Sequence, residues 1–363
     1  MGNHDLAPAL FLVFVVSFVL SAIIWITKRW QLNSIRRRND TAARQASHSV
    51  PTPRLGGVAV MIALAVGSLL IAGIVGAKAV LFLLTLPPLF LGGLLEDLGY
   101  GVSPRQRLFA AAISSALVII FFKVWIVRVG VPGVDTLLAI APIGIIFTIF
   151  AAVGVSNAFN LIDGLNGLSV STAIMTASSL AYVSNAHGLN EISVMCFVLI
   201  TALGGFLFFN YPFGKVFLGD AGAYSIGQVL VWLAIAIMFF APDISPAAIL
   251  LIFFWPVADT ALAIYRRRRS GRRTDQPDRL HFHQLAMRAL EISYLGKRRR
   301  ELANPLATAI IVPLIAMPQL AGIYFNSSNT MAFAMLGGFS ILFVLGYFAG
   351  VRWARANAGR FYR

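Results

Sequence analysis

Cysteine and charged residues are both scarce in this 363-residue chain. The single cysteine, Cys196, excludes a disulfide or a cysteine-rich metal site within one chain, and its apolar surroundings indicate an ordinary buried side chain. Only 12% of the residues are charged and 58% are hydrophobic. Ordinary soluble domains are about 25% charged. The composition therefore excludes a typical soluble domain and favours a membrane protein.

Several informative motifs are also missing. The sequence has no Gly-x-x-x-x-Gly-Lys-Ser/Thr loop and no Gly-x-Gly-x-x-Gly fingerprint, which counts against ATP and dinucleotide binding. Its histidines and its cysteine form no cluster typical of zinc. No internal repeat is visible, whereas many transporters are built from repeated halves with broken helices. These absences count against ATP-driven and transport functions.

Hydrophobic residues occur in blocks of roughly 17 to 23, the length that an α-helix needs to cross about 30 Å of hydrocarbon. A membrane β-barrel would show short alternating segments instead. The pattern predicts an all-α, polytopic integral membrane protein with about eleven transmembrane helices. The predicted spans are 8–27, 56–75, 79–97, 107–122, 137–155, 168–184, 192–209, 222–240, 246–265, 305–323 and 330–351.

Positive charge is concentrated on one side of these spans. Of the 29 lysine and arginine residues, 26 fall in alternate connections and in the C-terminal tail. The positive-inside rule then predicts an N-terminus outside, a C-terminus in the cytoplasm and a first span that is an anchor rather than a cleavable signal peptide. Orientation explains the net charge of +15 without a nucleic acid partner. The main cytoplasmic loops are predicted at 28–55 and 266–304, with a basic tail at 352–363.

Five of the fourteen acidic residues lie at or just inside predicted cytoplasmic span ends. A carboxylate costs about 2.5–3.5 kcal/mol at the centre of a membrane helix and less near its end, so this placement requires a reason. The alternative to a functional reason is pairing with arginines of the adjoining loops, which applies best to Asp259, seven residues before Arg266. The five residues are Glu96, Asp97, Asp163, Asp220 and Asp259.

Asp220 lies between Gly219 and Gly222, where the backbone can approach a ligand. Such a helix start can offer N–H groups to phosphate oxygens while its carboxylate holds a metal ion. Glu96 and Asp97 are adjacent, so on a regular helix their side chains diverge by about 100° and one can bind metal while the other does a different job. Mg²⁺ suits such a site, because one or two carboxylates, water and substrate phosphates are enough to hold it.

Asp163 lies in a run rich in amides and glycines that starts at Asn157 and follows the fifth predicted span. If the run is helical, Asn160, Asp163 and Asn166 share one face. A polar face at this position has no explanation in contact with lipid. The run is therefore predicted to bind a polar ligand.

The predicted loop 266–304 combines a polybasic run with a histidine motif. For Arg266–Arg269 we favour attraction to anionic lipid. For 278–284 we favour a function, because two of the five histidines, His281 and His283, stand there beside Arg279. Residues two apart share a side of an extended segment but not of a helix, so joint action requires non-helical backbone. Together these side chains can contact a diphosphate or a sugar phosphate.

Taken in order, the motifs resemble the polyprenyl-phosphate N-acetylhexosamine-1-phosphate transferases of the MraY and WecA type, which are glycosyltransferases of family 4. The similarity covers about residues 51–290, and the odd number of predicted spans is closer to the WecA branch. It rests on Pro53-Arg54-Leu55-Gly56-Gly57, Leu95-Glu96-Asp97, Asn157-Ala-Phe-Asn160-Leu-Ile-Asp163-Gly-Leu-Asn166, Phe217-Leu-Gly219-Asp220-Ala-Gly222, Pro256-Val-Ala-Asp259-Thr260 and Asp278-Arg279-Leu-His281-Phe-His283-Gln284.

The resemblance implies one membrane-embedded transferase domain over 1–363, in the bacterial inner membrane with its site facing the cytoplasm. It implies transfer of a sugar-1-phosphate from a UDP-N-acetylhexosamine to undecaprenyl phosphate, with release of UMP and with Mg²⁺ or Mn²⁺ as cofactor. Such a step initiates a cell-envelope polysaccharide such as an O-antigen. A phospho-N-acetylmuramoyl-pentapeptide transferase is the alternative within the family. A homodimer is neither required nor excluded.

Carried over by position, the resemblance also implies roles for single residues. Metal binding falls to Asp220, with Asp97 in support. Catalytic roles fall to Glu96, Asp97, Asp163, His281 and His283. Substrate binding falls to Asn157, Asn160, Asn166, Arg279 and Gln284. In the family pattern, the position of Glu96 is proposed to interact with the lipid phosphate, Asp163 and Asn166 lie on the nucleoside side, and the two histidines contact diphosphate or sugar.

Three residues depart from the family pattern, since Glu96 and Asn166 replace aspartates and Gln284 replaces a histidine. Their side chains can still coordinate or form hydrogen bonds, so we expect a divergent active enzyme rather than an inactive homologue. Exchange of one phosphoanhydride for another depends on positioning and charge. We favour direct attack by the ionised lipid phosphate over a covalent carboxylate intermediate. A transporter and a polybasic scaffold are the non-enzymatic alternatives, and a scaffold leaves the glycines around Asp220 unexplained.

Overall fold

The computed structural model describes residues 6–29, 52–271, 280–296 and 299–357, and these residues form helices and short connections without a strand. The helices are α1 (Leu6–Ile26), α3 (Gly56–Leu70), α4 (Ala72–Val75), α5 (Lys78–Leu83), α6 (Pro87–Asp97), α7 (Pro104–Phe122), α8 (Val134–Leu138), α9 (Ala141–Ile162), α10 (Leu168–Ala186), α11 (Asn190–Asn210), α12 (Gly219–Phe240), α13 (Pro246–Ile252), α14 (Phe254–Arg269), α15 (Phe282–Leu290), the π-helix η2 (Glu291–Leu295), α16 (Arg300–Tyr324) and α17 (Asn329–Ala356).

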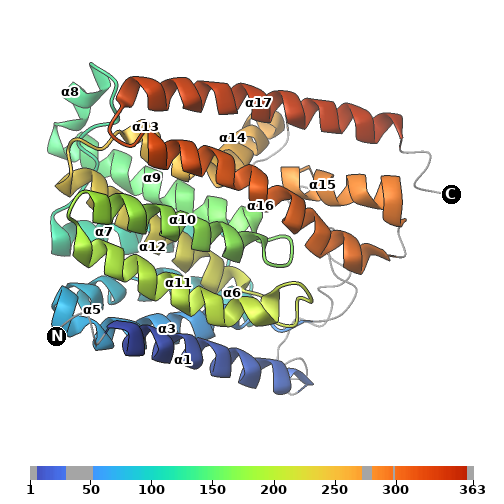
Figure 1. Ribbon diagram of the computed structural model, residues 1–363, viewed down its shortest axis with the longest axis horizontal. Coiled ribbons are helices and arrows are strands. Elements are labelled where there is room, and N and C mark those ends of the chain that lie inside the picture. The colour runs from blue at the N-terminus through green and yellow to red at the C-terminus, as the bar shows by residue number, and fades with distance from the viewer. Residues whose placement is uncertain (1–5, 30–51, 272–279, 297–298, 358–363) are drawn as a thin grey trace.

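The all-α, polytopic membrane architecture predicted from the sequence is confirmed. Within the described residues, seven helices are long and apolar enough to cross a membrane, and the bent pair α13 and α14 makes an eighth candidate. Each of the eleven predicted spans overlaps a helix or a pair of consecutive helices. The helices run side by side in one bundle, with the start of α1 and the end of α17 at opposite ends (Figure 1).

The helix α12 lies at the centre of the bundle. In its apolar stretch 78% of the residues are buried, whereas in the apolar stretches of α1 and α17 only 17% are buried. It contacts α3, α6, α9, α10 and α11, which surround it. Small residues in its first turns allow this close packing, because a Cβ on Gly222 would approach Gly57 of α3 to 2.7 Å and one on Gly227 would approach Ser156 of α9 to 2.8 Å.

The helix α9 continues to Ile162, whereas the predicted span ended at residue 155. The run that starts at Asn157 is therefore helical as far as Ile162. Polar residues in the extra turns bond to α12, where Ser156 Oγ donates to Oε1 of Gln228 at 2.6 Å and Asn157 Oδ1 accepts from the hydroxyl of Tyr224 at 3.0 Å. Because tertiary partners satisfy these groups, the helix does not end where its hydrophobic pattern ends.

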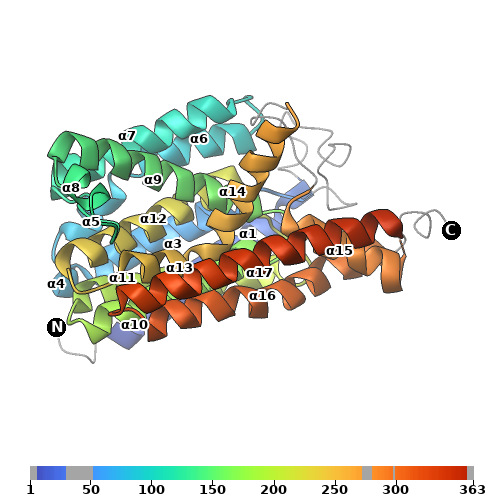
Figure 2. The ribbon, with the colours of Figure 1, turned by 90° about the horizontal axis from the view of Figure 1, so that it is seen from above.

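The predicted span 246–265 is broken. The axes of α13 and α14 differ by 83°, and Phe253 separates them. Pro256 explains the break, because proline has no N–H to bond to the carbonyl of Ile252 and its ring would clash there. In Figure 2 α14 stands away from the direction of its neighbours, which carries Asp259 toward α15.

The region predicted as the loop 266–304 is largely helical where it is described. It contains the end of α14, all of α15 and η2, and the start of α16 at Arg300. One face of α15 packs against α16 and α17, with Met287 buried in an apolar cluster that includes Ala303 and Phe343. A short amphipathic helix of this kind gains its stability from tertiary packing, which a search for long hydrophobic runs does not detect.

Candidate active site

The carboxylate of Asp97 binds the first turn of α12. Its Oδ1 accepts a hydrogen bond from the backbone N–H of Asp220 and its Oδ2 from that of Ala221, each at 2.9 Å. Asp97 is the last residue of α6 and only 2% exposed, and its negative charge also interacts favourably with the helix dipole. These two N–H groups therefore bond to Asp97 and are not available to a phosphate.

Glycine lets three helices approach each other at this point. A Cβ on Gly93 of α6 would lie 2.5 Å from the backbone N and Cα of Ala221, and a Cβ on Gly57 of α3 would collide with Gly222. Gly219 begins α12 with a φ of +75°, a conformation that favours glycine. The start of α12 is therefore placed by backbone contact with α3 and α6.

The side chain of Asp220 meets groups from two further helices. Its Oδ2 forms an ion pair with the guanidinium of Arg107 in the first turn of α7. Its Oδ1 accepts a hydrogen bond from Nδ2 of Asn160 at 3.2 Å. The Asp220 side chain remains 19% exposed. A carboxylate, a cation and an amide thus converge at a point that solvent can reach.

Arg107 is a site residue that the sequence reasoning missed. A signal for it exists, since Arg107 lies in the first turn of the helix that follows Asp97 after a short connection. A capping box of Ser103 and Gln106 starts that helix, so its first turn follows the end of α6 after a short connection. Its guanidinium also lies 5.6 Å from the ring centroid of Tyr224 on α12.

Asp163 lies one residue beyond the end of α9, in the turn that leads to α10. Some of the residue is accessible, but protein atoms surround its carboxyl group, and this burial raises the pKa of Asp163 to about 7 although the Arg54 cation opposes it. Asp163 follows Asn160 on the same chain segment. Near the end of α9, the amide of Asn160 therefore contacts Asp220, and the carboxyl of Asp163 follows three residues later.

Asn166 is 5% exposed, and the turn around it is not helical, so the predicted shared helical face with Asp163 does not form. Its Nδ2 donates to the carbonyl of Pro212 at 2.8 Å. Its Oδ1 lies against Gly214, where a Cβ would be 2.5 Å away. The Asn166 side chain thus links the turn between α9 and α10 to the connection between α11 and α12.

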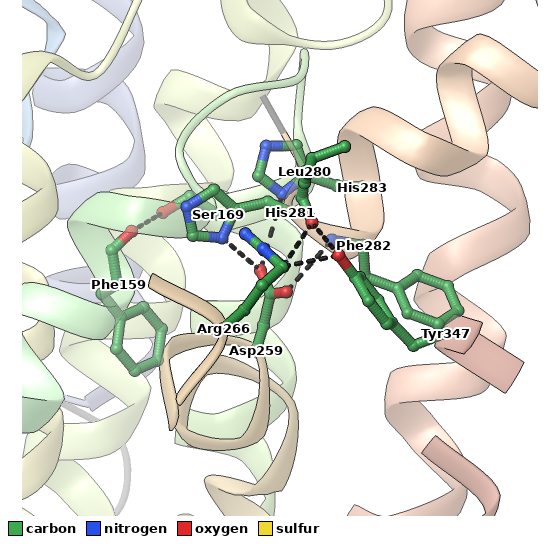
Figure 3. A network of polar contacts seen from close by, with 9 residues as sticks. All are labelled: Phe159, Ser169, Asp259, Arg266, Leu280, His281, Phe282, His283 and Tyr347. Carbon is green, nitrogen blue, oxygen red and sulfur yellow. Dashed lines mark hydrogen bonds and ion pairs between the residues drawn. The ribbon is translucent and has the colours of Figure 1, made fainter. Parts of the chain in front are cut away.

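Asp259 organises the histidine motif, as Figure 3 shows. Its Oδ2 lies 2.9 Å from Nδ1 of His281 and its Oδ1 accepts a hydrogen bond from the backbone N–H of Phe282 at 3.0 Å. The alternative pairing of Asp259 with Arg266 is not the contact seen, because Arg266 instead donates to the carbonyl of Leu280 at 3.0 Å. Asp259 thus holds the start of α15.

The two histidines stack, with ring centroids 5.6 Å apart and planes 15° apart. His281 precedes α15 with extended backbone, at φ −66° and ψ 150°, which is the non-helical geometry that joint action requires. His283 is 1% exposed, and burial lowers its pKa to about 4, with the Asp259 carboxylate opposing this shift and His281 adding to it. The imidazole of His283 is therefore neutral near pH 7.

The His283 ring also contacts the turn that carries Asp163, because a Cβ on Gly164 would collide with its Nε2. The end of α9 and the turn after it therefore contact both Asp220, through Asn160, and His283, through Gly164. Glu96, 8% exposed, lies next to Asp97, and Gln284 lies in the first turn of α15. Arg279 and Asp278 lie outside the described residues.

Comparison with known proteins gives a consistent result. The profile of glycosyl transferase family 4 matches residues 79–238. The decaprenyl-phosphate N-acetylglucosaminephosphotransferase of Mycobacterium tuberculosis (strain ATCC 25618 / H37Rv) is 30% identical over 324 residues, which are 80% of this chain and 76% of that protein. The chain belongs to glycosyl transferase family 4.

Other members of family 4 are similar over different lengths. The Mycolicibacterium smegmatis enzyme of the same name is 28% identical over 81% of this chain and 77% of its own length. The undecaprenyl-phosphate alpha-N-acetylglucosaminyl 1-phosphate transferase of Escherichia coli (strain K12) is 29% identical over 54% of this chain and 55% of its own. The family resemblance inferred from the motifs is confirmed, and the protein is a transferase.

The acidic residues in the described spans also fit a family 4 enzyme better than a transporter. In the seven candidate spans they are Glu191, Asp220 and Glu301, and each lies in the first turn of its helix. An ion path needs ionisable groups near the middle of the membrane. These seven helices offer none among their acidic side chains.

Proposed function

We propose that this protein transfers N-acetylglucosamine-1-phosphate from UDP-N-acetylglucosamine to a polyprenyl phosphate and releases UMP. Family membership supports this reaction, since the similar mycobacterial and Escherichia coli proteins are named for polyprenyl phosphates and N-acetylglucosamine. The observation that carries the proposal to this chain is the convergence of Asp220, Arg107 and Asn160 at the start of the central helix.

The reaction exchanges one phosphoanhydride bond for another. An oxygen of the lipid phosphate attacks the sugar-bearing phosphorus, and the bond from that phosphorus to the oxygen of UMP breaks. The nucleophile is already ionised near pH 7 and UMP leaves as an anion, so no proton transfer is needed. Positioning and charge neutralisation therefore supply the rate enhancement.

Arg107 supplies the cation for this chemistry. Its guanidinium can bind phosphate oxygens in a bidentate manner, and it lies partly accessible on the carboxylate of Asp220. In the substrate complex the guanidinium contacts the diphosphate. Asn157 and Asn160, one turn apart on α9, hold the neighbouring side chains Tyr224 and Asp220 in place.

The oxygen donors around Asp220 fit Mg²⁺. Each Asp220 oxygen accepts one bond from the protein and keeps a second lone pair, and Asn160 provides an amide oxygen. No group of three or more His, Cys, Asp or Glu residues that could hold a metal occurs in the described part of the chain. Asp220 would hold the ion, with Asp97 fixing the turn, and the remaining ligands would be water and substrate oxygens. When bound, Mg²⁺ neutralises charge on the diphosphate.

The site faces the cytoplasm in this proposal, and the membrane is the bacterial inner membrane. The positive-inside count supports this orientation, with the ends of α6 and α9 and the start of α12 on the cytoplasmic side. UDP-sugars are made in the cytoplasm, whereas the lipid phosphate resides in the membrane. A site at the helix ends on that side can reach both.

The test is UMP release by purified protein supplied with undecaprenyl phosphate, Mg²⁺ and a panel of UDP-sugars. We expect release that requires both the lipid and the metal, and UDP-N-acetylglucosamine as the best donor. Asp220→Asn and Arg107→Gln should each lower kcat by about 100-fold or more, as expected for groups that neutralise transition-state charge. The matched control is Arg105→Gln, because Arg105 lies in the same turn of α7 but is exposed.

The outcomes separate the alternatives. Release of more than one equivalent of UMP per protein without lipid would mean hydrolysis of the donor, and no release with any UDP-sugar would overturn the proposed function. A pentapeptide-bearing N-acetylmuramic acid donor that outperforms every simple UDP-sugar would move the protein to the alternative within the family. Isolation of a sugar-phosphate adduct of the protein in the absence of lipid would replace direct attack by a covalent route.

A further inference from the structure

The turn between α9 and α10 depends on side chains from other helices for its hydrogen bonds. It spans residues 163–167, and its own backbone supplies few bonds, among them Gly164 N–H to the carbonyl of Ile162 at 2.8 Å. The N–H of Gly167 donates to Oδ1 of Asn210 on α11 at 2.7 Å. The polar groups of such a buried turn must find partners elsewhere in the fold.

Two side chains of α16 satisfy the backbone of Asn166 in this turn. Oδ1 of Asn304 accepts a hydrogen bond from the Asn166 N–H at 2.8 Å, and Oγ1 of Thr308 donates to the Asn166 carbonyl at 2.8 Å. Asn304 and Thr308 are four residues apart and so share a face of α16. They are 1% and 2% exposed, and we call this pair the α16 clamp.

Apolar packing supports the same contact. Leu165 belongs to the buried cluster that contains Ala303 and Ala307, the residues that neighbour the clamp on α16. Small side chains there let α16 approach the turn closely. The turn is thus held at Asn166 by hydrogen bonds from α16, and Leu165 next to it shares a buried apolar cluster with the same helix.

The clamped turn carries groups of the candidate active site. Asp163 is its first residue, and Gly164 next to it lies against Nε2 of His283. A shift of the turn therefore moves the Asp163 carboxyl relative to Asn160 and removes the surface on which His283 rests. The helix α16 contributes none of the predicted site residues and lies outside the residues matched by the family profile.

We propose that Asn304 and Thr308 are positioning residues for the transferase reaction, which act through the backbone of Asn166 to hold Asp163 and the His283 contact in place. The inference rests on the proposed function, because its consequence is a change in the use of UDP-N-acetylglucosamine. Loss of the clamp lowers kcat/KM for this donor and leaves the KM for the lipid phosphate unchanged.

The first experiment compares Thr308→Val with Thr308→Ser in the UMP-release assay. Valine keeps the shape but removes the hydroxyl donor, whereas serine keeps it. We expect Thr308→Val to lower kcat/KM for UDP-N-acetylglucosamine by about tenfold and Thr308→Ser to retain activity within about threefold, in line with the cost of one unsatisfied buried carbonyl. The matched structural control is Gln319→Ala on the same helix, since Gln319 is 3% exposed and bonds to Thr176 and the Ile252 carbonyl away from the turn.

A second measurement reads the turn directly. In Asn304→Ala the backbone amide of Asn166 loses its acceptor, so its hydrogen–deuterium exchange should accelerate by at least about tenfold, while the amide of Gly167, held by Asn210, changes less. If Asn304→Ala does not fold, the milder Thr308→Val carries the test.

Each outcome decides between the claims. Active wild-type protein in which Thr308→Val and Gln319→Ala behave alike, both with unchanged kcat/KM, would overturn the clamp and leave the proposed function intact. Inactive wild-type protein with every UDP-sugar would overturn the proposed function, and the clamp would fall with it. Faster exchange at Asn166 together with the selective loss in kcat/KM supports the clamp.

Discussion

Aspartates of the site differ in what their carboxylates contact. Asp97 uses both oxygens on backbone N–H groups of α12, and Asp259 uses both on the start of α15, and each is 2% exposed. Asp220 instead faces Arg107 and Asn160 with 19% of its side chain exposed. The first two therefore hold structural elements in position, whereas Asp220 is accessible to a ligand.

The buried carboxyl of Asp163 leads to a prediction about pH and stability. Its pKa is raised to about 7 by burial, above the ordinary value of 3.8. Between these values the folded protein binds the proton and the unfolded chain does not, so stability falls as pH rises through this window, and the cost is complete above pH 7. Asp163→Asn removes the charge and hence the cost.

We therefore expect Asp163→Asn to stabilise the protein relative to wild type more at pH 8 than at pH 5, by on the order of 2 kcal/mol. This difference appears as a larger rise in Tm at pH 8. The measurement is thermal unfolding in detergent at both pH values. Exposed Glu301, changed to Gln, is the control and should show little pH-dependent difference. Equal changes in Tm for Asp163→Asn at both pH values would contradict this account of the carboxyl.

Among the elements, α12 is the one on which the site depends most, because its first turn carries Asp220 and its burial fixes that turn relative to α3, α6 and α9. Because Gly93 of α6 has no side chain, α6 lies directly against the backbone of α12. Asp97 can then reach the N–H groups of Asp220 and Ala221. Helix packing of this closeness is typical of small residues in membrane helices.

Two neighbouring glycines in α6 allow a matched test of this contact. Gly93→Ala places a methyl group 2.5 Å from the backbone of Ala221, and α12 must move to accommodate it. Gly92→Ala meets only the Cβ of Ala110 at 3.5 Å, an ordinary contact. Alanine is also favoured over glycine in a helix by about 1 kcal/mol, which acts equally on both variants.

We expect Gly93→Ala to lose about 2 kcal/mol or more of stability and most transferase activity, and Gly92→Ala to match or exceed the wild-type stability. Thermal unfolding and UMP release measure the two effects. Gly93→Ala with wild-type activity would show that the position of α12 relative to α6 does not control the site.

At the scale of the whole molecule, residues from α6, α7, α9, α12 and α15 meet toward one end of the helix bundle. The distribution of lysine and arginine predicts that this end faces the cytoplasm. Exposed hydrophobic side chains cover the outer helices, for example Phe150 at 74% and Leu345 at 62%, which suits contact with lipid. In the proposed orientation, the arrangement puts a polar site at the boundary between water and membrane.

The proposed orientation can be tested with introduced cysteines, because the single native cysteine, Cys196, is buried and can be replaced by alanine. Exposed Ser327 lies between α16 and α17, and exposed Tyr294 lies in η2. We expect a membrane-impermeant maleimide to label Ser327→Cys but not Tyr294→Cys in intact cells whose outer layers admit the reagent. Labelling only at Tyr294→Cys would reverse the orientation.

The sequence by itself determined the class of the molecule and the neighbourhood of the site. Hydropathy is local and directly visible, so eleven apolar segments could be recognised and all of them contain helix. Carboxylates are so rare in this chain that their positions at span ends pointed to Asp97, Asp163, Asp220 and Asp259. The motif order was enough to recognise the family.

Tertiary structure alone decided which of these residues meet, and how. The partners Asp97 and Asp220 are separated by 123 residues, Asn166 and Asn304 by 138, and Arg107 is paired with a carboxylate far along the chain. Local patterns carry no information about such pairs, because they arise when helices pack side by side. The same reason explains the longer α9 and the amphipathic α15, since both depend on polar or apolar partners that only the assembled bundle supplies.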